Sequence, residues 1–179
     1  MKSLVFALLL ALVQAASAQT LRLQGPEILP TGQAFSLQLW LDEPFAGRAA
    51  DEELLFFGLG LQSSGLRFLG FEPAADWLDD SPWLGEQHIG ASRFPGLSNQ
   101  GQGSEALGWL HFEALEPGSL WLSLSSTADD PNLGLGYWHG GNLAAQVQWQ
   151  GAVVPLPGSL ALVLVAGLAL WMGRRRLWD

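Results

Sequence analysis

Hydrophobic and polar side chains alternate with a period of two along much of this chain. The clearest alternation lies between Ala34 and Leu41, where the two kinds of residue fall on opposite faces: Phe35, Leu37, Leu39 and Leu41 on one, Ser36, Gln38 and Trp40 on the other. This period is typical of a half-buried β-strand. The pattern therefore predicts a strand with one face in a hydrophobic core.

Further segments show the same alternation, or an apolar run short enough for a strand. They are Leu21 to Leu23, Leu54 to Leu61, Leu66 to Phe71, Leu107 to Glu113, Ser119 to Ser125 and Ala145 to Val153. In the fourth of these, the alternation places Leu107 with Trp109 and His111, opposite Leu110 and Phe112. The side chains expected in the core are Phe35, Leu37, Leu39, Phe56, Leu110, Phe112, Leu120, Leu122 and Leu124.

Two long stretches lack this periodicity. Asp76 to Gly103 and Ala128 to Gly141 are rich in Gly, Asp, Asn and Pro, and we expect both to be ordered loops. Shorter clusters such as Glu116-Pro117-Gly118 predict tight turns. About seven short strands with turns between them, and almost no helix, indicate an all-β fold, an antiparallel β-sandwich.

The N-terminus has the three parts of a secretory signal. Lys2 supplies a positive charge, Leu4 to Val13 is apolar, and Ala16-Ser17-Ala18 is a small-residue cleavage site. We expect signal peptidase to remove residues 1–18, so that Gln19 becomes the first mature residue. The alternative, an uncleaved signal anchor, fits less well because the apolar run is short.

The C-terminus has an apolar run between a Pro-x-Pro entry and a basic end. No residue from Leu156 to Met172 is charged, a length of about 17 residues and about 25 Å of helix, the lower edge of what spans a bilayer. The arginines that follow, Arg174, Arg175 and Arg176, mark the cytoplasmic side. We therefore expect a sandwich domain at 19–152 and a C-terminal segment at 153–179 that contains the Pro-Leu-Pro motif, one transmembrane helix and the arginine cluster.

This C-terminal order resembles a known sorting signal. The matching positions are Val154-Pro155-Leu156-Pro157, the Leu-rich run with Gly167, and Arg174 to Arg176. They resemble the PEP-CTERM class of exosortase signals in its Val-Pro-Leu-Pro variant, although Leu177-Trp178-Asp179 makes the end longer than usual. The resemblance implies an inner-membrane anchor that exosortase cuts near the prolines, releasing the protein to the cell surface or beyond. A permanent single-pass anchor is the alternative.

Composition narrows the range of partners. The chain has no cysteine, which excludes disulfides and thiolate metal ligands, and its formal net charge is −9. Without the two terminal segments, 4 basic and 16 acidic side chains remain. Such a surface repels nucleic acid and anionic membrane, so we expect neither as a partner of the domain.

A second resemblance covers about a hundred residues of the domain. It is carried by the apolar spacing of Leu54 to Leu61, of Leu66 to Pro73, and of Leu107 to Gly118 with its Pro-Gly turn. These segments look like strands of cohesin-like domains, which are jelly-roll sandwiches related to carbohydrate-binding modules. The resemblance implies a non-catalytic binding module, but it does not identify the binding surface, and the Trp-rich stretch after Asp76 departs from the family.

Catalytic and metal-binding motifs are missing from the sequence. The histidines His88, His111 and His139 have no metal-ligand spacing, and no Gly-x-Ser-x-Gly, Walker or dinucleotide pattern is present. The pairs Asp79-Asp80 and Asp129-Asp130 could serve a glycosidase, and the second pair with Asn132 could bind Ca²⁺, but adjacent acids in Gly/Pro loops more often form turns. We expect no enzyme, no cofactor and no metal.

Tryptophans in the expected loops are the candidate ligand-binding residues. Trp77, Trp83 and Trp138 lie among carboxylates and amides, where an exposed flat ring can stack on a sugar. The competing interpretation is that these rings pack the loops. We therefore expect an exported envelope or matrix protein with a binding or structural domain for polysaccharide or another envelope protein; the alternative is a dedicated carbohydrate-binding module.

Overall fold

The computed structural model describes residues 19–101, 103–127 and 130–155. Among these residues, no helix is long and apolar enough to cross a membrane. The signal peptide at 1–18, the apolar run from Leu156 and the arginines Arg174, Arg175 and Arg176 lie outside the described residues.

The described residues form strands and one four-residue helix, so the expectation of an all-β fold with almost no helix is confirmed. The elements are β1 Thr20–Gln24, β2 Ile28–Pro30, β3 Ala34–Asp42, β4 Glu53–Ser64, β5 Leu66–Pro73, β6 Leu78–Asp79, α2 Ser81–Leu84, β7 His88–Ser98, β8 Ser104–Ala114, β9 Gly118–Ser125, β10 Gly134–Tyr137, β11 Gly141–Leu143 and β12 Gln146–Val154.

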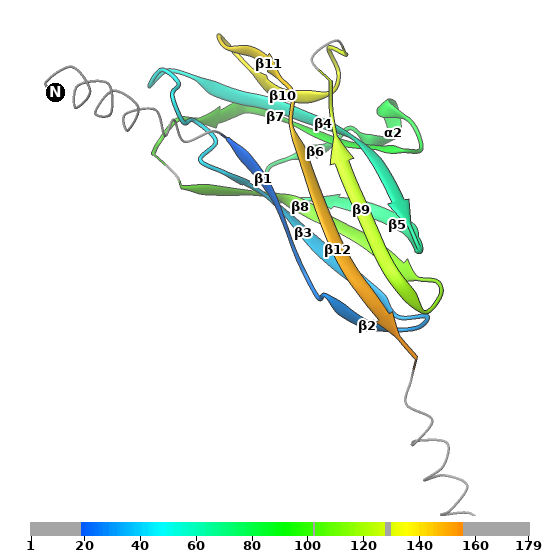
Figure 1. The fold of residues 1–179 in the computed structure, drawn as a ribbon. Helices are drawn as coiled ribbons and strands as arrows, with labels where there is room; N and C mark the ends of the chain where they lie inside the picture. The colour runs from blue at the N-terminus through cyan, green and yellow to red at the C-terminus, as the bar shows by residue number, and fades with distance from the viewer. Residues whose placement is uncertain (1–18, 102, 128–129, 156–179) are drawn as a thin grey trace, which may run out of the picture.

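The strands form two sheets that face each other (Figure 1). The smaller sheet has the order β1-β3-β8-β5, with all neighbours antiparallel. The larger has the order β11-β10-β4-β9-β12-β2, and β7 pairs with the other side of β4 and carries β6. Only β12 and β2 run parallel among these pairs. The result is an antiparallel β-sandwich with one parallel edge.

The core lies between the sheets and consists of the inward positions predicted by alternation. In β3, Phe35, Leu37, Leu39 and Leu41 are buried. Phe35 contacts Phe112 of β8 at 5.9 Å and Trp149 of β12 at 5.7 Å between ring centroids, so aromatic side chains join the sheets. Packed rings of this kind add to the apolar burial that stabilises a domain without disulfides.

Both expected loops contain strands, which corrects the sequence interpretation. The stretch from Asp76 holds β6, α2 and the eleven-residue β7, and the stretch from Ala128 holds β10 and the start of β11. In β7 and β10, glycine occupies positions where a residue of a neighbouring segment approaches the strand closely. A Cβ at Gly136 of β10, for example, would lie 1.9 Å from the Phe56 ring. Glycine removes the apolar alternation, so a buried strand of this kind has no period-two pattern.

Two core assignments are also corrected. Leu107 is fully buried with Leu110 rather than facing outward with Trp109, because Leu39 pairs with Gly108 and Trp40 with Ala106, leaving a bulge in β8. Phe56 is partly exposed on the outer face of β4, and its neighbour Phe57 takes the core position with 1% exposure.

The last strand reaches into the proposed sorting motif. β12 continues to Val154, two residues past the boundary expected at 152, and its end pairs with β2 through Ala152–Ile28, Val153–Leu29 and Val154–Pro30. The motif therefore begins inside the sheet, and Pro155 is the first residue after it.

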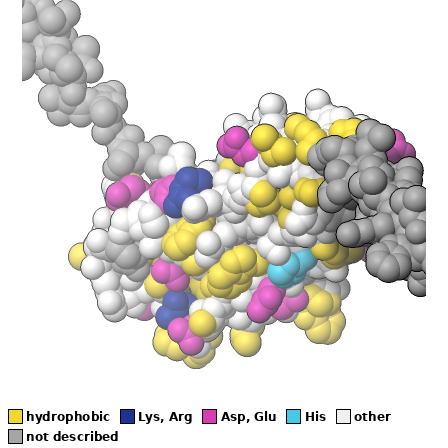
Figure 2. Space-filling model, turned by 90° about the horizontal axis from the view of Figure 1, so that it is seen from below, with side chains coloured by type: hydrophobic (Ala, Val, Ile, Leu, Met, Phe, Trp, Pro, Cys, Tyr) yellow, Lys and Arg dark blue, Asp and Glu magenta, His cyan; other side chains and the backbone are white. Residues whose placement is uncertain are grey.

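The surface keeps several large apolar side chains. Figure 2 shows one face on which hydrophobic side chains lie beside a histidine and among acidic and basic groups. The large hydrophobic residues that are most exposed include Ile28, Leu78, Trp83, Phe94 and Trp138.

Candidate functional site

The three candidate tryptophans have different environments. Trp77 is only 5% exposed, and its ring meets Phe57 edge-on at 5.4 Å, so it belongs to the core and is not available to a sugar. Trp83 is 87% exposed and Trp138 is 65% exposed. The interpretation of loop packing is therefore correct for Trp77, whereas Trp83 and Trp138 present their rings to solvent.

Trp83 stands at the wall of an open cleft of about 400 Å³ on the outer face of the larger sheet. The helix α2 forms one side, and the loop before β10 forms the other with Pro131 and Asn132. Phe56 of β4 and Ser92 of β7 lie at the base, and Asp80 and Leu84 complete the α2 side. Trp138 is not among the residues that line the cleft, so only one of the two exposed tryptophans, Trp83, belongs to it.

Glycines in the sheet let the walls of this cleft sit close to the strands. Gly58 of β4 pairs with Gly90 of β7. Because neither residue has a side chain, the segments that form the cleft walls can pack directly on the backbone of these strands. A Cβ at Gly58 would come within 2.2 Å of the Asn132 carbonyl oxygen, and one at Gly90 within 2.5 Å of Leu84. The two glycines therefore determine the cleft, because larger residues would displace both walls.

Hydrogen bonds hold α2 in place beside the cleft. The Asp80 amide donates to the Gly90 carbonyl at 2.9 Å, and Ser81 Oγ accepts from the Gly90 amide at 3.1 Å. The Asp79 carboxylate accepts from the Ser81 amide at 2.9 Å, which is a turn contact. In the opposite loop, Asp130 accepts from the Asn132 amide at 2.9 Å in the same way. These contacts agree with the interpretation of the carboxylate pairs as turn formers; Asp129 lies outside the described residues.

Two further apolar side chains extend this exposed region. Leu78 of β6 is 66% exposed and pairs with Ser92 of the cleft base. Phe94 is 94% exposed and lies in the part of β7 that protrudes between the pairs Phe56–Ser92 and Leu54–Leu97. We call Leu78, Trp83 and Phe94 the β6–β7 surface. Sequence analysis missed Leu78 and Phe94, because they lie in a stretch taken for a loop.

Arg93, next to Phe94 in the chain, is paired with acidic side chains. Arg93 lies 3.5 Å from Glu105 and 3.8 Å from Asp76. The charge of Arg93 is therefore balanced beside the apolar side chains of the β6–β7 surface.

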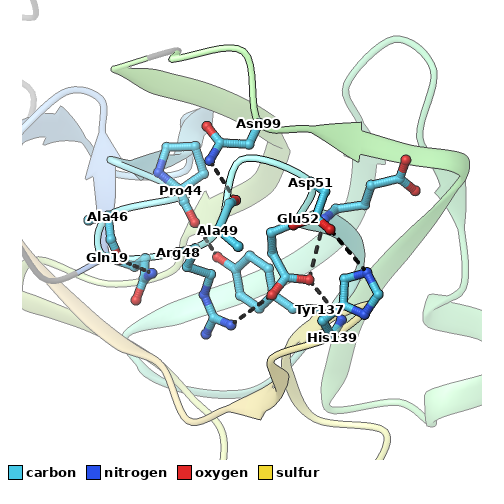
Figure 3. Close-up of polar contacts among 11 residues, drawn as sticks. Gln19, Pro44, Ala46, Arg48, Ala49, Asp51, Glu52, Asn99, Tyr137 and His139 are labelled. Atoms are coloured by element: carbon cyan, nitrogen blue, oxygen red, sulfur yellow. Dashed lines mark hydrogen bonds and ion pairs between the residues drawn. The ribbon is translucent and has the colours of Figure 1, made fainter.

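A buried polar network lies at the end of the sandwich near Trp138 (Figure 3). Glu52 is 4% exposed, and one carboxylate oxygen accepts from the His139 amide at 2.8 Å. Its other oxygen lies 3.5 Å from Arg48, whose guanidinium covers the Tyr137 ring at 3.7 Å. The Tyr137 hydroxyl donates to the Pro44 carbonyl. These contacts join the β3–β4 loop to the β10–β11 turn.

The network shifts two ionisation equilibria. Burial raises the pKa of Glu52, but hydrogen bonds from the amides of His139 and Glu53, together with Arg48, outweigh it and hold that pKa below the ordinary value of 4.5. Burial also raises the pKa of Tyr137 to about 12, although the Arg48 charge opposes it. At neutral pH, Glu52 is therefore ionised and pairs with Arg48, whereas the Tyr137 hydroxyl keeps its proton.

The remaining polar candidates are considered for the part of the chain that the structure describes. Within residues 19–101, 103–127 and 130–155, no three His, Asp or Glu side chains gather as metal ligands. His111 lies 2.8 Å from Ser36 Oγ through Nδ1 and 3.5 Å from Glu72 through Nε2, as expected for a partly exposed histidine on the outer face of a sheet.

Comparison with known proteins identifies the fold. No protein-family model and no curated protein matches the chain. The cohesin module of the Clostridium perfringens ATCC13124 family 33 glycoside hydrolase matches with a TM-score of 0.56 at 11% identity, over 77% of this chain and 98% of that module.

Two other solved structures match more weakly. A type II cohesin domain from the cellulosome of Acetivibrio cellulolyticus has a TM-score of 0.45 at 9% identity, over 78% of this chain and 92% of its own. A conjugative transposon lipoprotein from Bacteroides eggerthii DSM 20697 has a TM-score of 0.34 at 10% identity, over 74% and 95%. Only the first match carries weight, and with the strand order above it establishes that this chain folds as a cohesin-like β-sandwich.

Proposed function

We propose that this chain is an exported cell-envelope protein whose sandwich is a non-catalytic binding domain, with the β6–β7 surface as its docking site. The observation that carries this proposal is the exposure of Leu78, Trp83 and Phe94 at 66%, 87% and 94% on neighbouring elements. Exposed apolar patches mark interaction sites, and aromatic side chains provide most of the binding energy in such sites.

A non-catalytic role is supported by the chemistry of the cleft. Among the described residues, Asp80 is the one carboxylate that lines the cleft, and the neighbouring Asp79 is engaged in a turn. Glycoside hydrolysis ordinarily uses two carboxyl groups across one bond. The cleft therefore has the features of a binding site without those of that reaction.

The route to the envelope rests on the two ends of the sequence. A signal peptide at 1–18 leads to export, and the segment after Val154 first anchors the protein in the inner membrane. Exosortase then cuts near Pro155 and Pro157, so that the mature protein reaches the cell surface or the extracellular matrix. The end of β12 supports this proposal, since it delivers Pro155 directly from the sheet edge to solvent.

A second candidate function is favoured by the cleft itself. Trp83 offers an apolar ring, and Asp80, Ser92 and Asn132 offer hydrogen-bonding groups around an open volume of about 400 Å³. A pyranose has an apolar face and a rim of hydroxyls, so this combination suits a neutral oligosaccharide. In this case the domain acts as a carbohydrate-binding module.

One set of variants tests the docking site and separates the two functions. We expect Trp83→Ala and Phe94→Ala to release the processed protein from the envelope fraction of its native host, with Trp138→Ala as the matched control. A sugar site predicts instead that indole fluorescence responds to oligosaccharides, and that Trp83→Ala alone abolishes the response. Retention of all variants in the envelope, without a sugar response, would contradict both.

A further inference from the structure

The outer face of the smaller sheet carries two tryptophans on neighbouring strands. Trp40 of β3 and Trp109 of β8 are both partly exposed, and their strand neighbours Leu39 and Leu110 point into the core. Gln38 pairs directly with Trp109, and Trp40 lies two residues further along β3. The two residues therefore occupy a diagonal pair of positions on neighbouring strands, within reach of each other for large aromatic side chains.

The bulge in β8 produces this arrangement. Without it, Leu107 and Trp109 would share a face, but Gly108 takes a φ of 153° and turns Leu107 inward and Trp109 outward. A Cβ at Gly108 would lie 2.5 Å from the Glu72 carbonyl oxygen, so glycine is required there. The outward position of Trp109 is thus built into the sheet.

Polar side chains surround the two rings in regular rows. One row crosses all four strands as Gln24, Gln38, Trp109 and Glu72, and the next contains Arg22, Trp40 and Ala106. The face offers both flat apolar area and hydrogen-bonding groups.

The charges on this face are largely satisfied within the sheet. Arg22 lies 2.9 Å from Asp42 and 5.4 Å from the centre of the Trp40 ring, and Asp42 also accepts from Ser104 at 2.7 Å. Hydrogen bonds from Arg22 and then Ser104 hold the pKa of Asp42 below its ordinary value. Arg67 pairs with Glu113. These pairs leave little net charge to attract an ionic ligand.

We propose that this face is a second binding surface, for an extended neutral polysaccharide that stacks a pyranose unit on Trp109 and contacts the Trp40 ring beside the Arg22 guanidinium that lies over it. The apolar face of a pyranose can cover an indole ring, and its hydroxyls can reach Gln38 and its neighbours. An anionic polymer is disfavoured, because the domain has 16 acidic and 4 basic side chains. The surface lies on the sheet opposite the β6–β7 surface, so both can be occupied together.

Sedimentation of the exported protein with insoluble polysaccharide tests this proposal. The probes are microcrystalline cellulose and chitin, which are neutral, with alginate gel as the anionic comparison. We expect the protein to bind at least one neutral probe and not alginate, and the double variant Trp40→Ala/Trp109→Ala to lose at least tenfold in affinity. Trp121→Ala is the matched control, since Trp121 is a partly exposed strand tryptophan on the other sheet.

A second double variant guards against misfolding. Trp40→Leu/Trp109→Leu keeps apolar side chains but removes the flat rings, and we expect the same loss with an unchanged circular dichroism spectrum. Absence of binding to both neutral probes, equal loss in Trp121→Ala, or full binding by the leucine variant would overturn the proposal. Loss in Trp83→Ala alone would also overturn it and assign sugar binding to the cleft of the proposed function instead.

Discussion

At the scale of single residues, neighbours of the same type have opposite roles. Trp77 and Trp83 are six positions apart, yet one is 5% and the other 87% exposed. The difference arises because Trp77 packs on Phe57 in the core between the sheets, whereas Trp83 lies in α2, which has no buried residues. We therefore expect stability to depend on Trp77, whereas Trp83 is exposed and is part of the proposed binding surface.

Substitution of these two residues separates stability from binding. We expect Trp77→Ala to lower the free energy of unfolding by about 3–5 kcal/mol, because it leaves a large cavity in the core. Trp83→Ala should change it by less than about 0.5 kcal/mol, as surface substitutions do. Urea unfolding followed by circular dichroism measures both, and similar losses in the two variants would contradict these assignments.

The buried carboxylate Glu52 predicts a dependence of stability on pH. Its pKa is lowered in the folded protein, so its ionised form contributes stability that is fully present above 4.5 and is lost as the pH falls through the folded value. Glu52→Gln should cost about 3 kcal/mol at neutral pH, since Arg48 keeps no carboxylate partner.

The melting temperatures of the two proteins, measured between neutral pH and the acid range, check this expectation. The gap between wild type and Glu52→Gln should narrow as the pH falls below 4.5. Asp51→Asn is the control, because the Asp51 side chain is 80% exposed and should change stability little at any pH. A gap that stays constant with pH would show that Glu52 does not act through its charge.

At the scale of elements, alternation predicted the strands built from large apolar residues and missed those built from glycine. β3 was predictable because Leu37 and Leu39 face the core, while Gln38 between them faces outward. β7 and β10 were not, since Gly90 and Gly136 stand where neighbours leave no room for a side chain. The cleft could not be predicted from the sequence for the same reason. Its two walls pack over Gly58 and Gly90, and only the pairing of β4 with β7 brings these glycines together.

The short strand β2 is expected to hold the end of β12. Leu29 is 2% exposed and pairs with Val153, so Leu29→Ala should lower the free energy of unfolding by about 2–5 kcal/mol. The neighbouring Ile28 is 68% exposed, and Ile28→Ala should have an effect below about 0.5 kcal/mol. Guanidinium unfolding compares the two, and equal effects would mean that β2 does not pack as the structure indicates.

At the scale of the whole molecule, the sandwich separates its surfaces. The proposed docking site lies on the larger sheet, the proposed polysaccharide surface lies on the smaller one, and the described chain ends beside β2, after β12 (Figure 1). This separation allows the protein to be anchored or processed at one end while both faces stay accessible. It also means that each proposed activity can be removed without disturbing the others.

Processing at the two ends gives the final prediction. The mature protein should begin at Gln19 and lack Arg174, Arg175 and Arg176, with its new C-terminus at or after Pro155. Cleavage before this point is disfavoured, because β12 is paired with β9 through Val153 and with β2 through Val154, and peptidases act on unpaired, exposed segments. Intact-mass measurement of the protein from its native host decides the outcome. A mass that includes the three arginines would mean that the tail is a permanent anchor. A mass that corresponds to a C-terminus before Val154 would mean that the end of β12 unpairs during processing.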